Sequence, residues 1–277
     1  MIPVIIFHMG NQPYVHQCIE QGLKFKNDIH LLSDVPDSYK MHETAKVIDY
    51  KHYTSNMFRF QSLYKHYSTN SYQLEFICII RWMCICEYMH RHNIQKAFIC
   101  DSDVLLYDNI ETIVKTLYPE DMYLCSSPSK NLTGGQSIFT LQKLYEFVNF
   151  VFEFYQTQIP RIDAWHKTSK EGGGVCDMTL LYYFAHNTKE FQGLRLPNYP
   201  YFENDLTKIV DDEFTFDLHM GSNGNHIHPE DYEMIENHKH IKIIDGKAYC
   251  YNMRLKKDIR FVLLHFQGNN KRIMNQY

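Results

Sequence analysis

Two aspartates separated by one residue are the side chains in this sequence most suited to chemistry. Asp101 and Asp103 follow an apolar run over residues 97–100, which predicts a buried strand. Residues two apart on an extended chain point to the same side, so both carboxylates can face one point at the carboxyl end of that strand. Two unpaired carboxylates held this close repel each other, and a bound divalent cation relieves the repulsion. We therefore interpret the pair as metal ligands.

A second polar segment follows the apolar run over residues 261–264. It reads His265-Phe266-Gln267-Gly268-Asn269-Asn270-Lys271, so an imidazole, a glycine and an ammonium group recur at intervals of three residues. An imidazole can complete a metal shell, a glycine lets the backbone approach phosphate oxygens, and a lysine supplies a positive point charge. Together with the aspartates, this segment predicts a site for a metal ion and a diphosphate.

This combination of Asp-x-Asp with a late His-x-x-Gly-x-x-Lys resembles the GT-A glycosyltransferases, in particular the group of glycogenin and the bacterial galactosyltransferases. The resemblance implies an α/β fold with a Rossmann-type, mostly parallel central sheet flanked by helices. It implies a hexosyl- or pentosyltransferase that moves a sugar from a nucleotide-sugar donor, expected to be a UDP-sugar, to a glycan or other hydroxyl acceptor. The implied metal ligands are Asp101, Asp103 and His265, and the implied diphosphate contacts are Gly268 and Lys271.

The expected metal is Mn²⁺ or Mg²⁺, and mixed oxygen and imidazole ligation favours Mn²⁺. Other donor contacts are assigned by their place in such a fold. The loop after the first predicted strand and the end of the next strand lie where the nucleotide base and ribose bind. Arg81, on the helix expected before the strand over residues 97–100, resembles a basic residue that many GT-A enzymes direct at donor phosphates or sugar. These predicted donor contacts are His8, Gly10, Asn11, Asp34, Arg81 and Ser102.

Asp177 follows three glycines and begins a predicted helix, where related enzymes keep an acid facing the reacting sugar. If the reaction inverts configuration, Asp177 is the candidate base for the acceptor hydroxyl. The alternative is that its side chain only caps the helix. The family motif continues with Pro-Trp after its lysine, whereas this chain has Arg272 and Ile273, so the sequence leaves retention or inversion open.

Two other functional classes fit parts of the sequence. A haloacid-dehalogenase-type phosphatase also uses Asp-x-Asp after an apolar strand, and Asp211 with Asp212 would then be its later acidic pair. That motif normally opens its domain, however, and the late His-Gly-Lys triplet would have no role. The second class is a non-catalytic carbohydrate-binding protein with a degenerate transferase site. Lesser hypotheses are acceptor contacts at Trp165 and His166, and a zinc cluster of four loop histidines: His226, His228, His238 and His240.

Alternating short apolar runs and helical patterns predict the elements that position these residues. Strands are expected over residues 3–8, 29–32, 46–50, 97–100, 121–125, 137–140, 241–244 and 261–264. Helices are expected over residues 12–24, 58–67, 73–92, 110–117, 141–156 and 176–185. A turn is expected over residues 132–135 and a loop-rich region over residues 194–239. From residue 265 we expect a mobile tail that closes over the donor.

We expect one domain over residues 1–277, with a nucleotide-binding half (1–100) and a metal- and acceptor-binding half (101–277).

The composition excludes several classes of protein. The net charge is −4 with both signs interspersed, so no basic stripe indicates nucleic-acid binding. Most of the eight cysteines lie in apolar runs without a CxxC pair, which indicates reduced thiols in a cytosol-like compartment. The start of the chain lacks the features of a signal peptide, and no apolar run approaches the ~20 residues of a membrane span. We therefore expect a cytoplasmic protein without a membrane span.

Overall fold

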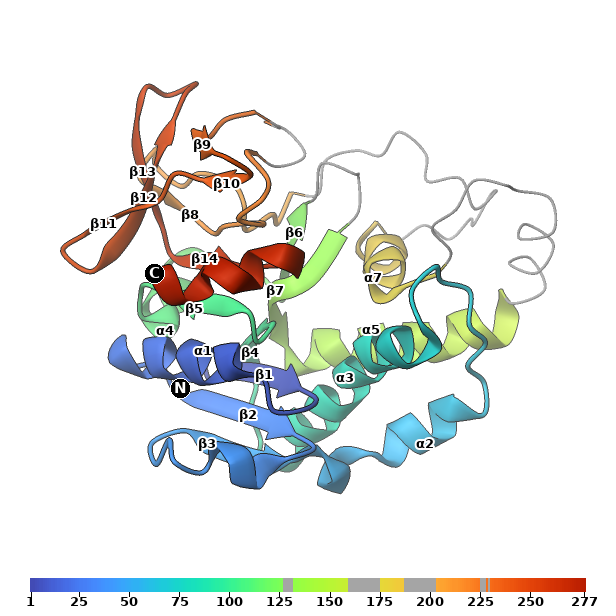
Figure 1. Cartoon of the computed structure of the whole chain (residues 1–277). Coiled ribbons are helices and arrows are strands. Elements are labelled where there is room, and N and C mark those ends of the chain that lie inside the picture. Colours follow the sequence, from blue (N-terminus) through green and yellow to red (C-terminus); the bar gives the residue numbers. More distant parts are fainter. Residues whose placement is uncertain (127–131, 159–174, 187–202, 225–227, 229) are drawn as a thin grey trace.

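A six-stranded sheet forms the centre of the computed structural model, which describes residues 1–126, 132–158, 175–186, 203–224, 228 and 230–277 (Figure 1). The strand order is β3-β2-β1-β4-β7-β6. The pairs β2–β3, β1–β2 and β1–β4 are parallel, and β7 runs antiparallel to both of its neighbours. The predicted α/β class with a mostly parallel sheet is confirmed. The strands are β1 (Val4–His8), β2 (Ile29–Ser33), β3 (Lys46–Asp49), β4 (Lys96–Cys100), β6 (Met122–Ser126) and β7 (Leu132–Thr140).

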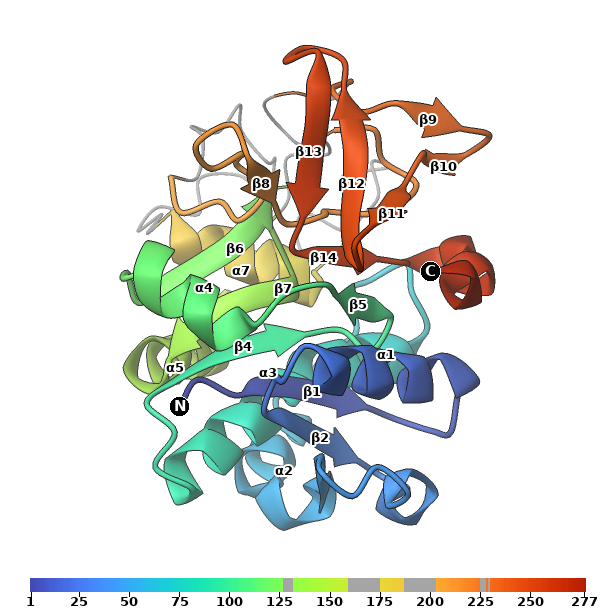
Figure 2. The same cartoon turned by 90° about the vertical axis from the view of Figure 1, so that its left-hand side faces the viewer.

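Helices cover both faces of this sheet, because alternate residues of a strand point to opposite faces. In β1, Val4 and Ile6 belong to a core shared with α1 and α4, whereas Ile5 and Phe7 belong to a core shared with α3, α5 and α7. Figure 2 shows α1 and α3 on opposite sides of β1. The helices are α1 (Pro13–Lys24), α2 (Ser55–Gln61), α3 (Tyr72–Arg91), α4 (Ile110–Leu117), α5 (Leu141–Thr157) and α7 (Asp177–Ala185), with 3₁₀ segments η1 (Pro36–Tyr39) and η2 (Tyr50–Tyr53).

A β-rich lobe follows α7 in the chain and lies beside α4 (Figures 1 and 2). Its four-stranded sheet has the order β11-β12-β13-β8, and a small hairpin of β9 and β10 accompanies it. The turn between β11 and β12 consists of Asp245 and Gly246, both with positive φ, as a two-residue hairpin turn requires. The strands are β8 (Phe214–Thr215), β9 (Met234–Ile235), β10 (His238–Lys239), β11 (Lys242–Ile244), β12 (Lys247–Asn252) and β13 (Lys257–Phe261).

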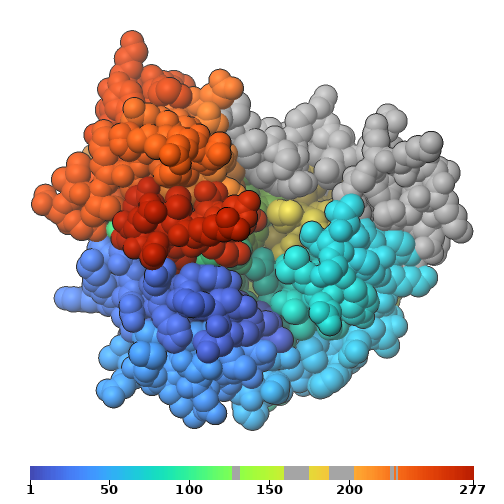
Figure 3. Space-filling model, in the orientation of Figure 1, coloured from blue at the N-terminus to red at the C-terminus, as the bar shows by residue number. Residues whose placement is uncertain are grey.

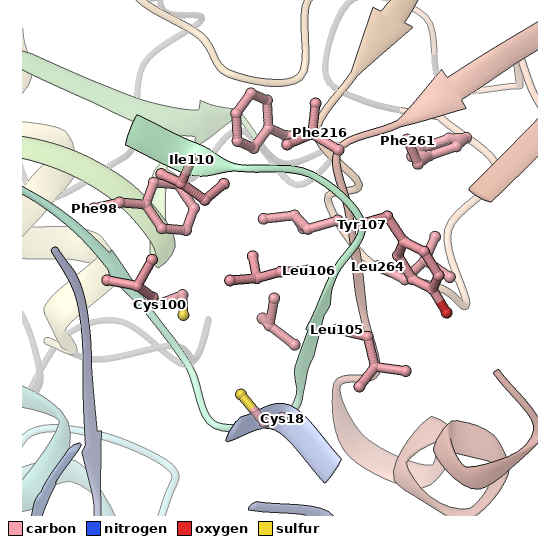
Figure 4. Close-up of a cluster of buried hydrophobic side chains, with 14 of the residues drawn as sticks. Cys18, Phe98, Cys100, Leu105, Leu106, Tyr107, Ile110, Phe216, Phe261 and Leu264 are labelled. Carbon is pink, nitrogen blue, oxygen red and sulfur yellow. The ribbon is translucent and has the colours of Figure 1, made fainter. Parts of the chain in front are cut away.

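The lobe is joined to the main sheet through a two-stranded pairing of β5 (Val104–Leu106) with β14 (Leu263–His265). The strands are antiparallel, with Leu263 opposite Leu106 and His265 opposite Val104. Figure 4 shows the apolar side chains around this junction, where the ring centre of Phe216 from the lobe lies 5.9 Å from the ring centre of Phe98 in β4. This buried cluster fixes the end of the chain against the segment that carries the two aspartates.

Several predicted elements differ from the structure. The expected turn at residues 132–135 is wrong, because these residues belong to β7. The expected strand over 261–264 is two strands, because the chain passes there from the lobe sheet (β13) to β14. The helix expected over 58–67 begins and ends earlier, as α2. The loop-rich region contains the short strands β8, β9 and β10.

The carboxyl-terminal segment makes more contacts with the rest of the chain than expected. It forms a 3₁₀ segment, η3 (Gly268–Gln276), that lies beside α1 (Figure 1). Phe266 and Met274 are buried, and the Tyr107 hydroxyl donates a hydrogen bond to the Tyr277 carbonyl at 2.9 Å. These contacts attach the tail to the core, so deletion of residues 265–277 would remove part of the core, and closure of the tail over the donor stays a prediction.

All eight cysteines are free thiols. In the described part of the chain, no helix combines the length and the apolar composition needed to cross a membrane.

Candidate metal and donor site

The two aspartates and the late histidine converge at one point. Asp101 and Asp103 directly follow β4, and His265 ends β14, which pairs with β5 immediately after the aspartates. One ligand atom from each of the three residues lies within 4.8 Å of the other two. His265 Nε2 is 3.7 Å from Asp101 Oδ2 and 3.4 Å from Asp103 Oδ1. The structure thus brings together the three predicted metal ligands from distant parts of the sequence.

Hydrogen bonding sets the orientation of the His265 ring. Nδ1 lies 2.8 Å from the Leu218 carbonyl oxygen, which can only accept, so Nδ1 carries a proton. Nε2 is buried, has no hydrogen-bond partner among the described residues, and faces the carboxylates. Burial lowers the pKa of His265, but the nearby Asp103 and Asp101 outweigh it and raise the pKa to about 9. A proton on Nε2 or a cation beside it would each offset the two negative charges.

The residues present fit a divalent cation. Two carboxylates and one imidazole form a donor set typical of Mn²⁺, and the orphaned Nε2 points at the carboxylate oxygens. Space is kept open beside them by Gly135, since a Cβ there would lie 2.9 Å from both Asp101 Oδ2 and His265 Cε1. The neighbouring Gly134 has a different role, because a Cβ there would overlap the Trp82 ring.

Gly135→Ala should weaken Mn²⁺ binding by on the order of tenfold or more, because the methyl group forces Asp101 and His265 apart. Gly134→Ala serves as the contrast: it should lower the melting temperature through overpacking against Trp82 while retaining Mn²⁺ binding. Titration of free Mn²⁺ by electron paramagnetic resonance, with a thermal melt of each variant, checks both. Unchanged Mn²⁺ affinity in a folded Gly135→Ala protein would contradict the assignment.

Lys271 and Gly268 both lie on η3, and Lys271 contacts the metal site. Lys271 Nζ is 3.0 Å from Asp103 Oδ2 and 5.5 Å from the centre of the Tyr14 ring. Burial raises the pKa of Asp103, but His265 and Lys271 more than offset it and hold that pKa well below its usual range. Gly268 has φ +64°, a conformation that favours glycine. Of the two predicted diphosphate contacts, Lys271 therefore lies beside the predicted metal ligands.

Arg81 joins the metal site to Asp177. Its guanidinium forms an ion pair with Asp101 and a second one with Asp177 Oδ2 at 2.8 Å. Burial raises the pKa of Asp177; Arg81 opposes this, and Glu75 adds to it. Asp177 is not the helix cap, because Cys176 occupies that position and Asp177 is the first residue of α7. Because Arg81 is paired with both acids, it would have to contact the donor from its position between Asp101 and Asp177.

The end of β1 contacts the segment between β4 and β5 that carries the two aspartates. His8 Nδ1 lies 2.8 Å from Ser102 Oγ, and the Gly10 N–H donates to Asp34 Oδ1 at 2.7 Å. Burial lowers the pKa of His8, which favours the neutral ring. Asn11 is exposed, and no interaction among the described residues ties it to this group. Figure 3 shows the surface hollowed between the carboxyl-terminal segment (red) and the start of α3 (cyan), with α7 (yellow) visible in the hollow.

The other candidates from the sequence do not join this site. Asp211 and Asp212 are exposed turn residues with positive φ in the lobe, and no described interaction links them to Asp101 or Asp103. His238 and His240 belong to no group of three potential metal ligands among the described residues. Trp165, His166 and His226 lie outside the described residues.

Sequence reasoning missed several residues that build the site. The Gly134-Gly135 pair was visible in the sequence, but only as a turn signal. Asp217 and Lys239 carried no signal, because both lie in a region without regular periodicity. In the structure both are buried: Asp217 accepts a hydrogen bond from the His265 backbone, and Lys239 pairs with Asp217.

No protein-family model and no curated sequence matches this chain. Among solved structures, mouse xyloside xylosyltransferase 1 in its apo form aligns with a TM-score of 0.49 and 10% identity, over 67% of this chain and 82% of that chain. The apo structure of WbbM, a bifunctional glycosyltransferase, aligns with a TM-score of 0.35 and 11% identity, over 53% of this chain and 34% of that chain. An active-site mutant of LgtC aligns with a TM-score of 0.35 and 11% identity, over 65% and 69%. At these identities and TM-scores the alignments assign no function to this chain.

Proposed function

We propose that this protein is a metal-dependent glycosyltransferase that moves a sugar from a nucleotide diphosphate sugar to a hydroxyl group of a glycan or other acceptor. The observation that carries the proposal is the convergence of Asp101, Asp103 and His265, with Lys271 beside them, at the carboxyl end of β4. Open α/β sheets bind ligands at this edge. An acidic pair with an imidazole and an ammonium group suits a ligand that combines a cation with a diphosphate.

The proposed chemistry requires charge stabilisation on the departing diphosphate. Asp101, Asp103 and His265 would hold Mn²⁺, which when bound supplies this stabilisation as a Lewis acid. Lys271 adds a positive charge from the other side of Asp103, and its position on η3 directs it at the same point. Gly268 has no side chain, and the space where a Cβ would lie is open.

The rest of the donor would extend toward the loop after β1. The hydrogen bond between His8 and Ser102 links that loop to the segment that carries the two aspartates. Asp34, which follows β2, accepts a hydrogen bond from the Gly10 N–H. We assign the base and ribose to this loop, and we take the nucleotide to be uridine diphosphate because of the motif's resemblance to the GT-A group.

The acceptor hydroxyl needs a group that removes its proton. Asp177 is buried beside Arg81, and its raised pKa makes it a better base than an ordinary aspartate. We assign Asp177 as the base of an inverting reaction. Arg81 would hold its carboxylate in place while also pairing with Asp101.

A thermal-shift series with nucleotide diphosphates and nucleotide sugars, with Mn²⁺ or with EDTA, tests the proposal. A ligand at about 100 times its dissociation constant adds about 2.7 kcal/mol to the free energy of unfolding, which raises the melting temperature by several degrees. We expect this shift for a UDP-sugar only in the presence of Mn²⁺. Lys271→Ala should lose most of the nucleotide-dependent shift and keep Mn²⁺ binding.

The matched control is Lys115→Ala, which removes an exposed lysine that pairs with Glu111 on α4, away from the site. Lys115→Ala should show the same nucleotide-dependent shift in melting temperature as the wild-type protein. Equal stabilisation by nucleotides in EDTA, or none by any nucleotide sugar, would contradict the proposed function.

A further inference from the structure

A segment of the lobe, residues 217–220, forms hydrogen bonds with the backbone and the ring of His265. Residues 217–220 run beside β14, where the Met220 amide donates to the His265 carbonyl oxygen at 2.8 Å. In the same segment, the Leu218 carbonyl oxygen accepts the Nδ1 proton of the ring. The side chain of His265 is buried, so its orientation depends on these protein contacts.

Asp217 anchors this segment with both of its carboxylate oxygens. Oδ2 accepts the backbone N–H of His265 at 3.0 Å, and Oδ1 accepts the backbone N–H of His219 at 3.2 Å. One side chain therefore ties the backbone of the histidine to the two residues that flank Leu218. This arrangement places the Leu218 carbonyl opposite Nδ1 and leaves Nε2 facing the aspartates.

Lys239, at the end of β10, supplies the charge that balances Asp217. Both residues are buried, with 1% of each exposed. Lys239 Nζ is 2.8 Å from Asp217 Oδ1 and donates to the His219 carbonyl oxygen at 2.6 Å and to the Ser222 carbonyl oxygen. All three ammonium protons thus have acceptors, which a buried charge requires.

We propose that Asp217, held by Lys239, is the positioning residue that fixes His265 for metal binding. The inference rests on the proposed function, because it assigns Asp217 to the proposed metal site. Asp217 touches neither the aspartates nor the reacting atoms in our assignment. It acts through the backbone of His265 and through Leu218, which together hold the tautomer with Nε2 free.

Two substitutions separate this role from simple stabilisation. In Asp217→Asn, Lys239 attracts the single amide oxygen, so the NH₂ group turns toward the His265 N–H, and two donors then face each other. In the double variant Asp217→Asn with Lys239→Met, no ammonium competes, so the amide oxygen can accept from His265. The NH₂ group then faces the His219 N–H, so the double variant should be less stable than the wild-type protein, but the acceptor for the His265 N–H is restored.

Titration of Mn²⁺ by electron paramagnetic resonance, with a thermal melt of each protein, tests the proposal. We expect Asp217→Asn to bind Mn²⁺ roughly 10–100-fold more weakly than the wild-type protein. The double variant should recover most of that loss. The control Asp231→Asn breaks another ion pair of the lobe, with Arg254, and should lower the melting temperature but leave Mn²⁺ affinity within about twofold.

Three outcomes would overturn the inference: wild-type affinity in Asp217→Asn, a double variant as weak as the single one, or an equal loss of affinity in Asp231→Asn. In each of these the wild-type protein binds Mn²⁺, and the proposed function is unaffected. A wild-type protein that binds no Mn²⁺ would overturn the proposed function itself, and the inference with it.

Discussion

Asp103→Asn is expected to lower metal-dependent sugar transfer by on the order of 10²-fold or more while leaving a folded protein. Asp103 is the buried member of the pair, and it contacts both His265 and Lys271. The substitution keeps the shape of the side chain but removes a charged oxygen ligand and leaves two cationic groups without their shared partner. Loss of Mn²⁺ affinity should accompany the loss of rate.

Two measurements check this expectation. The first is the rate of sugar transfer to an acceptor with and without EDTA, and the second is a Mn²⁺ titration of the variant. Asp108→Asn is the matched control, since Asp108 pairs with Lys247 and Arg260 away from the metal site. It should retain activity and lose some stability. Full activity of the wild-type protein in EDTA would rule out the metal assignment, whereas phosphate-ester hydrolysis that needs Asp101 as a nucleophile would favour the phosphatase.

Asp177→Asn is expected to reduce turnover by roughly 10²–10⁴-fold with little change in donor affinity. Its carboxylate accepts from Arg81 and lies close to the Trp82 indole nitrogen, and asparagine can keep that position without serving as a base. A base must be ionised, so the wild-type rate should fall as the pH is lowered through the pKa of Asp177. Burial raises this pKa, so the fall should come at a higher pH than for an exposed aspartate.

Steady-state kinetics over a range of pH, with the anomeric configuration of the product followed by nuclear magnetic resonance, checks this second expectation. Asp205→Asn is a suitable control, because Asp205 is also buried with a raised pKa but is bonded to Ser126 and Thr207 instead of Arg81. Unchanged turnover in Asp177→Asn would reduce the residue to a structural partner of Arg81. A retained anomeric configuration would likewise remove its role as the base.

Local sequence patterns predicted most strands of the central sheet and the chemical character of the site. Alternation along β1 assigns Val4 and Ile6 to one face and Ile5 and Phe7 to the other, and this pattern is local. The positions of Asp101, Asp103, Asp34 and Gly10 at strand ends follow from the same local patterns, because parallel strands end at one edge of a sheet. Residue types and short spacings were sufficient for these predictions.

Tertiary structure decided the rest, because the decisive contacts join residues far apart in the chain. The pairing of β5 with β14 brings His265 to the aspartates, and no local pattern separates β13 from β14 at the apolar run around Phe261. Gly135 has the sequence signal of a turn, but it lies in β7, which pairs with β4 and β6, and a Cβ there would lie 2.9 Å from Asp101 Oδ2 and His265 Cε1. The burial of Asp217 with Lys239 arises only when the lobe folds over β14, since a charged pair is placed by its partners and not by sequence periodicity.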